Sequence, residues 1–86
     1  MKILKFYASW CSPCKDLETT IDEIRDEIPY PFEDIDVEND TAGMIAKHEI
    51  VGIPTLVLLD GETEVRRHLG QFTVDTLREF VKVIAV

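Results

Sequence analysis

Two cysteines, Cys11 and Cys14, are separated by Ser12 and Pro13 in the segment WCSPC, and they are the only cysteines of the chain. Such a pair could be a structural disulfide, half of a metal site or a reversible redox couple. A bridge across so short a ring removes little conformational entropy from the unfolded chain. Zinc prefers four ligands, and the two histidines lack the spacing of a zinc finger. A Cys-x-x-Cys pair between a predicted strand and a predicted helix is typical of redox-active dithiols, so we expect a redox couple and no metal.

Cys11 is the expected nucleophile of this couple. Free amide groups and the positive dipole end at a helix start favour the thiolate, which lowers the cysteine pKa from about 8.5 towards about 7. The thiolate would attack a substrate disulfide, and Cys14, which we predict to be the more buried, would then attack Cys11 to release the product. Pro13 restricts the loop between the sulfurs. The sequence leaves open whether Trp10 belongs to the core or forms a platform for a docked chain.

The composition limits the remaining classes of function. The chain has 86 residues, 45% hydrophobic and 30% charged, which predicts a single globular domain over residues 1–86. Its net charge of −8 repels phosphate backbones and anionic membranes. The apolar run 50–59 is too short to span a membrane, and the first residues, MKILKFYAS, lack the pattern of a signal peptide. We therefore expect a cytoplasmic protein that binds neither nucleic acid nor membranes.

Hydrophobic periodicity predicts alternating strands and helices. Short apolar or alternating runs mark strands at 2–8, 32–37, 55–59 and about 63–69. Apolar residues at helical spacing predict a helix at 13–28 and a second at about 40–49, which Asn39 or Asp40 can cap. A third helix is predicted after Thr73, with its apolar positions at Leu77, Phe80, Val81 and Ile84. The order is βαβαββα, so the first two strands run parallel and the last two form a hairpin through Asp60 and Gly61. The predicted fold class is α/β, with a mixed four-stranded sheet flanked by helices.

Several segments resemble the thioredoxin family. They are FYASWCSPC at 6–14, GIPT at 52–55, the Asp60-Gly61 turn, Gly70 and the closing TLREFV helix, and with the element order they cover nearly the whole chain. The resemblance implies a thioredoxin-like fold with a cis peptide bond between Ile53 and Pro54. It also implies that the backbone of Ile53 pairs with an extended substrate segment. The substrate-binding residues it implies are Trp10, Pro13, Gly52, Ile53, Pro54 and Gly70, with Gln71 beside them.

Three departures from the family pattern concern the predicted site. Only Met1 and Lys2 stand where full-size members have an additional strand and helix. Ser12 stands between the cysteines where the family usually has glycine. Lys5 stands where members place a buried aspartate thought to manage the proton of the second cysteine, and Asp34 falls where many have a lysine.

We therefore predict that Lys5 and Asp34 form an ion pair beneath Cys14, with the lysine and the aspartate exchanged relative to the family pattern. The positive charge of Lys5 would favour the Cys14 thiolate. Asp34 would be an inward acid, which would explain why the apolar alternation slips between Phe32 and Ile35. The alternative, in which Lys5 extends into solvent, stays open. Ser12, Lys5 and Asp34 are the expected redox-tuning residues.

The sequence thus predicts a monomeric thiol-disulfide oxidoreductase that reduces protein disulfides without a cofactor. Its electron donor would be a thioredoxin-reductase-type protein or glutathione. One alternative is a glutaredoxin-type reductase that uses glutathione, for which Lys15, Thr55 and Arg66 or Arg67 are candidate contacts. The other is a thioredoxin-fold binding module without turnover, which would hold its partner even when both sulfurs are removed.

Overall fold

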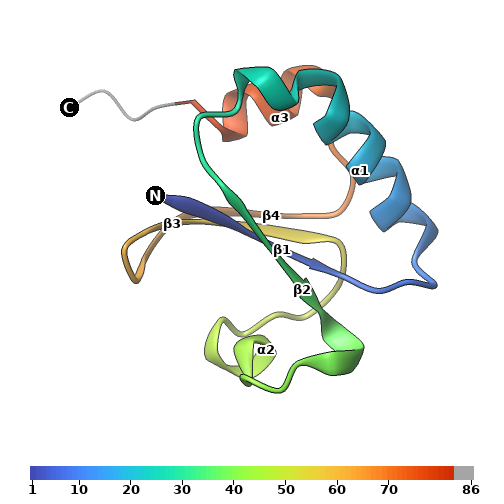
Figure 1. Cartoon of the computed structure of the whole chain (residues 1–86), viewed down its shortest axis with the longest axis vertical. Helices are drawn as coiled ribbons and strands as arrows, with labels where there is room; N and C mark the ends of the chain where they lie inside the picture. Colours follow the sequence, from blue (N-terminus) through green and yellow to red (C-terminus); the bar gives the residue numbers. More distant parts are fainter. Residues whose placement is uncertain (83–86) are drawn as a thin grey trace.

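The strands form one sheet in the order β2-β1-β3-β4, and the computed structural model describes residues 1–82 (Figure 1). The strands are β1 Lys2–Tyr7, β2 Phe32–Asp36, β3 Thr55–Asp60 and β4 Thr63–Leu69. The helices are α1 Ser12–Ile24, α2 Met44–Lys47 and α3 Val74–Phe80, with short 3-10 turns η1 Arg25–Glu27 and η2 Val37–Asn39. β1 pairs parallel with β2 and antiparallel with β3, and β3 pairs antiparallel with β4. The predicted order βαβαββα and the mixed sheet are confirmed.

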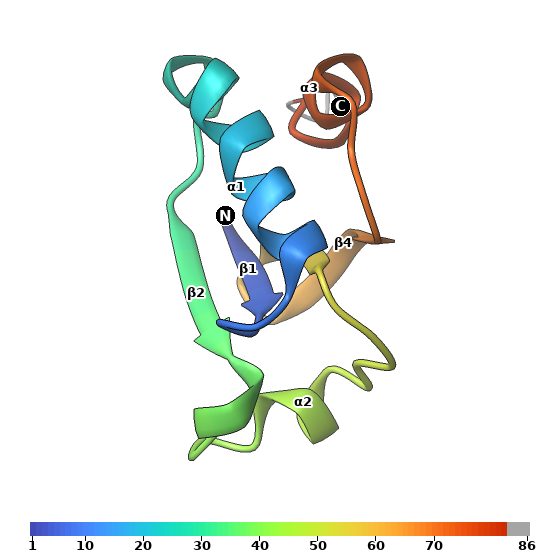
Figure 2. The ribbon, with the colours of Figure 1, turned by 90° about the vertical axis from the view of Figure 1, so that its right-hand side faces the viewer.

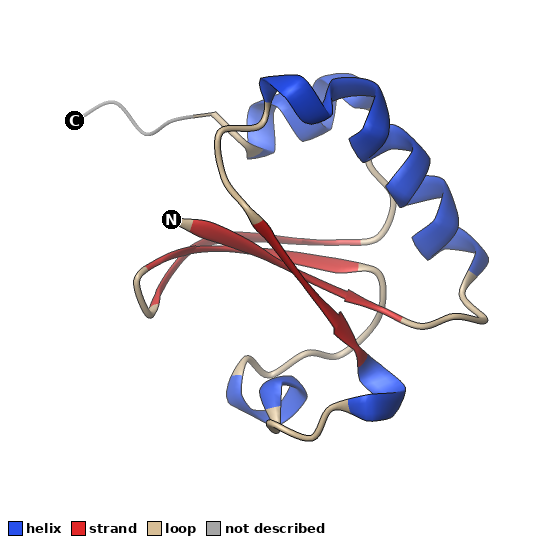
Figure 3. Ribbon diagram, viewed as in Figure 1, coloured by secondary structure: helices blue, strands red, loops and turns tan. Residues whose placement is uncertain are grey.

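Helices cover both faces of the sheet. α1 and α3 lie side by side over one face, and α2 lies on the other (Figures 2 and 3). Successive side chains of a strand point to opposite faces, so β1 contributes to two cores. Ile3 packs with Leu17 and Leu56 under α1 and α3, whereas Leu4 and Phe6 face the α2 layer. β1 therefore lies at the centre of the fold and leads directly into the cysteine loop.

α1 ends earlier than its sequence pattern predicts. Leu17, Ile21 and Ile24 form its buried stripe, as expected. The α-helix stops at Ile24, however, and η1 carries the chain to Ile28, which has extended backbone angles of φ −91° and ψ 113°. Ile28 precedes Pro29, and a residue before proline is disfavoured in the α region. The predicted end at Ile28 is therefore wrong by one turn.

β2 explains the slipped alternation, and the predicted inward orientation of Asp34 is wrong. Phe32 packs against the α1 and α3 core, whereas Ile35 is buried in the α2 core. Phe32 and Ile35 are separated by an odd number of positions, so their side chains point to opposite faces of the sheet. Because helices cover both faces, each side chain packs into a different core. Asp34 lies on an edge strand, and its side chain is 53% exposed.

α2 is much shorter than the predicted span 40–49. Gly43, directly before it, has a left-handed φ of 70°, which an α-helix does not contain. The N-cap is Gly43 and not the predicted Asn39 or Asp40, but the Asp40 carboxylate accepts hydrogen bonds of 2.8 Å from the backbone N–H groups of Met44 and Ile45.

α3 begins as predicted. The Thr73 hydroxyl caps it by accepting from the backbone N–H of Thr76 at 3.1 Å. Leu77, Phe80 and Val81 are buried, while Ile84, the last predicted apolar position, lies outside the described residues. Within residues 1–82, no helix is both long enough and apolar enough to cross a lipid bilayer.

Candidate active site

The two cysteines form a disulfide at the junction of β1 and α1. Their Cα atoms are 5.2 Å apart. Cys11 is the N-cap of α1, and its Sγ accepts a hydrogen bond of 3.2 Å from the backbone N–H of Cys14. Pro13 lies in the first helical turn, where its missing N–H costs no hydrogen bond. The predicted placement of Cys11 at a helix start is thus confirmed, and amide donors there favour a thiolate.

Cys11 and Cys14 are almost equally buried in this disulfide form, so the prediction that Cys14 is the more buried is not confirmed. Cys11 is 5% exposed and Cys14 is 8% exposed. Both pack with Ala8 in one small cluster, against which Tyr7 and Ile53 also lie. Cys14 borders a cavity that Cys11 does not line.

An apolar groove lies between Trp10 and the segment that leads into β3. Trp10 is 66% exposed, so it is not part of the core. The groove has a volume of about 230 Å³ and is lined by Trp10, Val37, Ile45, Ile50, Gly52 and Ile53. All six lining residues are uncharged, so this surface suits an apolar segment of a partner.

Hydrogen bonds hold the other predicted site residues around the pair. The Ile53-Pro54 peptide bond is cis, and the Pro54 carbonyl accepts a 2.8 Å hydrogen bond from the backbone N–H of Gly70. Gly70 has a left-handed φ of 100°, which favours glycine. The Gln71 side-chain amide donates at 3.0 Å to the carbonyl of Pro13. The CSPC segment, the GIPT segment and the loop before α3 are therefore joined.

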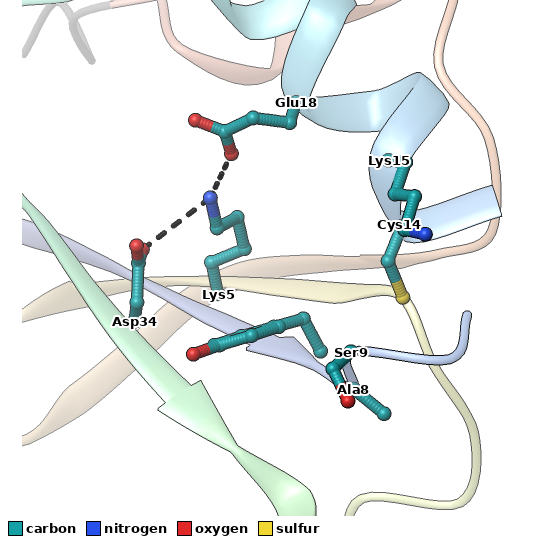
Figure 4. A pocket seen from close by; sticks show the side chains of 8 residues that line it. Lys5, Ala8, Ser9, Cys14, Lys15, Glu18 and Asp34 are labelled. Atoms are coloured by element: carbon teal, nitrogen blue, oxygen red, sulfur yellow. Dashed lines mark hydrogen bonds and ion pairs between the residues drawn. The ribbon is translucent and has the colours of Figure 1, made fainter. Parts of the chain in front are cut away.

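A second cavity, of about 420 Å³, borders Cys14 (Figure 4). It is lined by Lys5, Tyr7, Ala8, Ser9, Cys14, Lys15, Glu18 and Asp34. The Lys5 side chain is only 9% exposed, so it does not extend into solvent. Its ammonium contacts the Glu18 carboxylate and lies 3.5 Å from Oδ1 of Asp34. The structure thus pairs Lys5 with Asp34 and adds Glu18 as a closer partner.

The ion pairs continue along α1. Glu18 uses its second carboxylate oxygen to accept a 2.9 Å hydrogen bond from Arg25. Arg25 also donates to Asp22 at 2.8 and 3.0 Å, and this hydrogen bond, with the charges of Asp22 and Glu18, raises the pKa of Arg25. In the part of the chain that the structure describes, no group of three or more His, Cys, Asp or Glu side chains could hold a metal ion.

The model of the family described as Thioredoxin matches residues 1–83. The chain belongs to the thioredoxin family. Thioredoxin-1 of Saccharomyces cerevisiae is 36% identical over 70 residues, which are 79% of this chain and 66% of the yeast protein. Thioredoxin of Bacillus subtilis is 35% identical over 81 residues, 88% of this chain and 74% of that protein. A bifunctional thioredoxin reductase/thioredoxin of Mycobacterium leprae is 32% identical over 69 residues, 79% of this chain and 15% of that protein.

Solved thioredoxin structures share the fold. A mutant thioredoxin from Halobacterium salinarum superposes with a TM-score of 0.81 at 26% identity, over 96% of this chain and 76% of that one. Fasciola hepatica thioredoxin gives 0.78 at 30% identity, over 92% of this chain and 75% of that one. These matches confirm the thioredoxin-like fold. Thioredoxins are thiol-disulfide oxidoreductases, and we class this thioredoxin-family chain with them.

Sequence reasoning missed Glu18 as a residue of this thioredoxin site. Glu18 follows Cys14 by four residues, so both lie on one face of α1. That spacing was the available signal, but a row of acidic residues on an amphipathic helix predicts a solvated face. The contact with buried Lys5 becomes visible only once β1 packs beneath α1.

Proposed function

We propose that this thioredoxin-family protein reduces disulfides in protein substrates, with Cys11 as the nucleophile and Cys14 as the resolving thiol. The observation that carries the proposal is the sulfur of Cys11 at the N-cap of α1, bonded to Cys14 and beside an apolar groove. In the reduced protein the Cys11 thiolate attacks one substrate sulfur, which forms a mixed disulfide and expels the other sulfur as a thiolate. The Cys14 thiolate then attacks Cys11, so the second substrate thiolate leaves and the protein disulfide forms. Two electrons pass to the substrate.

The substrate in this proposal is an extended segment that lies over the groove. Trp10, Gly52 and Ile53 line the groove, and the backbone of Ile53 would pair with the segment as an added strand. Pro13, Pro54 and Gly70 act by holding the loops in place through the hydrogen bonds described above. Exposed apolar side chains continue the surface, since Val51 is 88% exposed beside Gly52. Exposed apolar surface of this kind marks protein contact sites.

The electron donor in this proposal is a protein of the thioredoxin-reductase type. The Mycobacterium leprae relative, whose printed name is bifunctional thioredoxin reductase/thioredoxin, supports this choice. A cytoplasmic location belongs to the proposal, because a reductase must work where thiols are kept reduced. We further propose that the protein acts as a monomer.

Glutathione is the less favoured donor. Its carboxylates would need cations near the disulfide. Arg67 donates to the carboxylate of Glu64 and, at 2.7 Å, to the carbonyl of His48. Arg66 donates to carbonyls at the end of α3, and the Thr55 hydroxyl donates to the Gly52 carbonyl. Of the candidates named in the sequence, Lys15 is the one that lines the cavity beside Cys14.

Three residues are proposed to tune the redox couple. Ser12 is the first residue of α1; it follows Cys11 in the sequence and is exposed. Lys5 and Asp34 line the same cavity as Cys14, and the positive charge of Lys5 favours the Cys14 thiolate. Each acts on the thiols through their electrostatic surroundings rather than by contact with substrate.

Reduction of insulin by the wild type, Cys11→Ser and Cys14→Ser tests the proposed function. We expect Cys11→Ser to abolish turnover and Cys14→Ser to accumulate the mixed disulfide, because each removes a different step. Parallel reactions driven by thioredoxin reductase and by glutathione with its own reductase identify the donor. A double variant that still binds its partner, together with a wild type that shows no turnover, would instead identify a binding module.

A further inference from the structure

Lys5 is a buried cation that two carboxylates share in a cavity also lined by the redox cysteine Cys14. Its ammonium lies between Glu18 of α1 and Asp34 of β2, and all three side chains line the cavity that Cys14 borders (Figure 4). The other titratable groups that face this cavity are Tyr7 from β1 and Lys15 from α1. A buried ammonium without anionic partners is costly, so the two carboxylates stabilise Lys5 in this position.

Glu18 is the stronger of the two partners. Its carboxylate contacts the Lys5 ammonium directly and is 41% exposed, whereas Asp34 is 3.5 Å away and 53% exposed. Arg25 binds the second oxygen of Glu18 at 2.9 Å, which fixes the orientation of the carboxylate. Charges that are less exposed and held in place are screened less by water and salt. The field that Lys5 exerts on Cys14 therefore depends chiefly on Glu18.

We infer that Glu18 is a positioning residue for the redox couple: it acts on Cys14 through Lys5, whose charge it partly offsets in the cavity that Cys14 also lines. The inference deepens the redox-tuning role of Lys5 and rests on the proposed function for its meaning in turnover. It requires that removal of the Glu18 charge and removal of Lys5 shift the Cys14 pKa in opposite directions. Loss of the Glu18 charge leaves Lys5 less compensated and favours the Cys14 thiolate, whereas loss of Lys5 leaves two carboxylates that disfavour it.

The consequence for turnover lies in the resolving step. Cys14 must lose its proton before it attacks Cys11 of the mixed disulfide. A lower Cys14 pKa increases the thiolate fraction at a given pH. Each thiolate is then a weaker nucleophile, with a Brønsted coefficient of about 0.4–0.5, so the rate of resolution rises less than the thiolate fraction.

The test is titration of Cys14 in a Cys11→Ser background, where coupling to the second thiol is absent. The Cys14 Cβ resonance in isotope-labelled protein reports the ionisation without any substrate. Glu18→Gln should lower the Cys14 pKa by several tenths of a unit, about a two- to threefold change in thiolate fraction below the pKa. Asp34→Asn should shift it in the same direction by less. Lys5→Met, which keeps a long apolar side chain in the buried site, should raise it.

Glu23→Gln is the matched control, because Glu23 is an exposed carboxylate of the same helix. It should leave the titration unchanged, and amide spectra establish that each variant is folded. Equal titrations for Glu18→Gln and Glu23→Gln would overturn the inference, as would shifts in the same direction for Glu18→Gln and Lys5→Met. Because no turnover is measured, these outcomes are independent of insulin reduction: either the inference or the proposed function can fail while the other stands.

Discussion

The side-chain amide of Gln71 donates a 3.0 Å hydrogen bond to the carbonyl oxygen of Pro13, from which it is 58 residues distant in sequence. This bond joins the loop before α3 to the first turn of α1. Two further bonds hold the same loop, since Gly70 donates to the Pro54 carbonyl and the His68 ring contacts the Gln71 carbonyl at 2.9 Å. The loop therefore connects the CSPC segment to the GIPT segment through hydrogen bonds.

We predict that Gln71→Ala destabilises the oxidised protein. The lost hydrogen bond contributes about 0.5–1.5 kcal/mol, and we expect the lower end because the bond is exposed. Gln71→Glu keeps the size of the side chain but places a carboxylate oxygen against the Pro13 carbonyl, so its loss should be at least as large. Urea unfolding of the oxidised forms measures both. Wild-type stability for Gln71→Glu would show that the donated bond contributes nothing.

Gly70 and Gly52 are predicted to differ in their tolerance of alanine. Gly70 has a φ of 100°, so Gly70→Ala should cost about 1–3 kcal/mol of unfolding free energy through backbone strain. A Cβ on Gly52 would lie 3.2 Å from Cδ1 of Leu69, a half-exposed side chain that can move aside. Gly52→Ala should therefore cost no more than about 0.5 kcal/mol. Chemical denaturation ranks the two, and an equal cost would contradict the assignment of strain to Gly70.

The sequence predicts best those features that depend on local pattern. The apolar stripe Leu17, Ile21 and Ile24 predicts the buried face of α1, and Asp60 with Gly61 predicts the turn between β3 and β4. The cysteine pair is predicted at the start of α1 because it separates a strand pattern from a helix pattern. Each of these requires only the residue types within a few positions.

Features that depend on packing between elements are predicted poorly. The orientation of Asp34 could not be inferred, because it requires knowledge that helices cover both faces of the sheet and that β2 lies at its edge. Only its four-residue spacing from Cys14 sets Glu18 apart from its acidic neighbours on α1, and its role becomes evident only when Lys5 is placed beneath it. The nearly equal burial of the two cysteine residues could likewise not be inferred, because it depends on how the elements pack around them.

Trp10 is predicted to contribute to substrate binding rather than to stability. Its side chain is 66% exposed at the edge of the groove, so Trp10→Ala should leave the unfolding free energy nearly unchanged. For insulin, kcat/KM should fall about tenfold, which corresponds to about 1.4 kcal/mol of lost contact with the protein substrate. A small symmetrical disulfide, which is too short to reach across the groove, serves as the control and should react at the wild-type rate. An equal loss for both substrates would place Trp10 in the chemistry of Cys11 instead.

The ion pair between Glu27 and Arg78 is predicted to make stability depend on pH. It joins η1 to α3, and the 3.0 Å hydrogen bond from Arg78 holds the pKa of Glu27 below its ordinary value. A carboxylate whose pKa is lower in the folded protein than in the unfolded chain stabilises the fold when the pH is above the unfolded-state pKa. This contribution is lost as the pH falls through the lower, folded-state pKa. Glu27→Gln should therefore lower Tm at neutral pH, less so in high salt, and the difference should vanish in acid. Glu23→Gln is the control, because Glu23 is an exposed carboxylate of the neighbouring α1. A Tm difference for Glu27→Gln that persists unchanged into acid would show that the effect comes from packing and not from the charge of the pair.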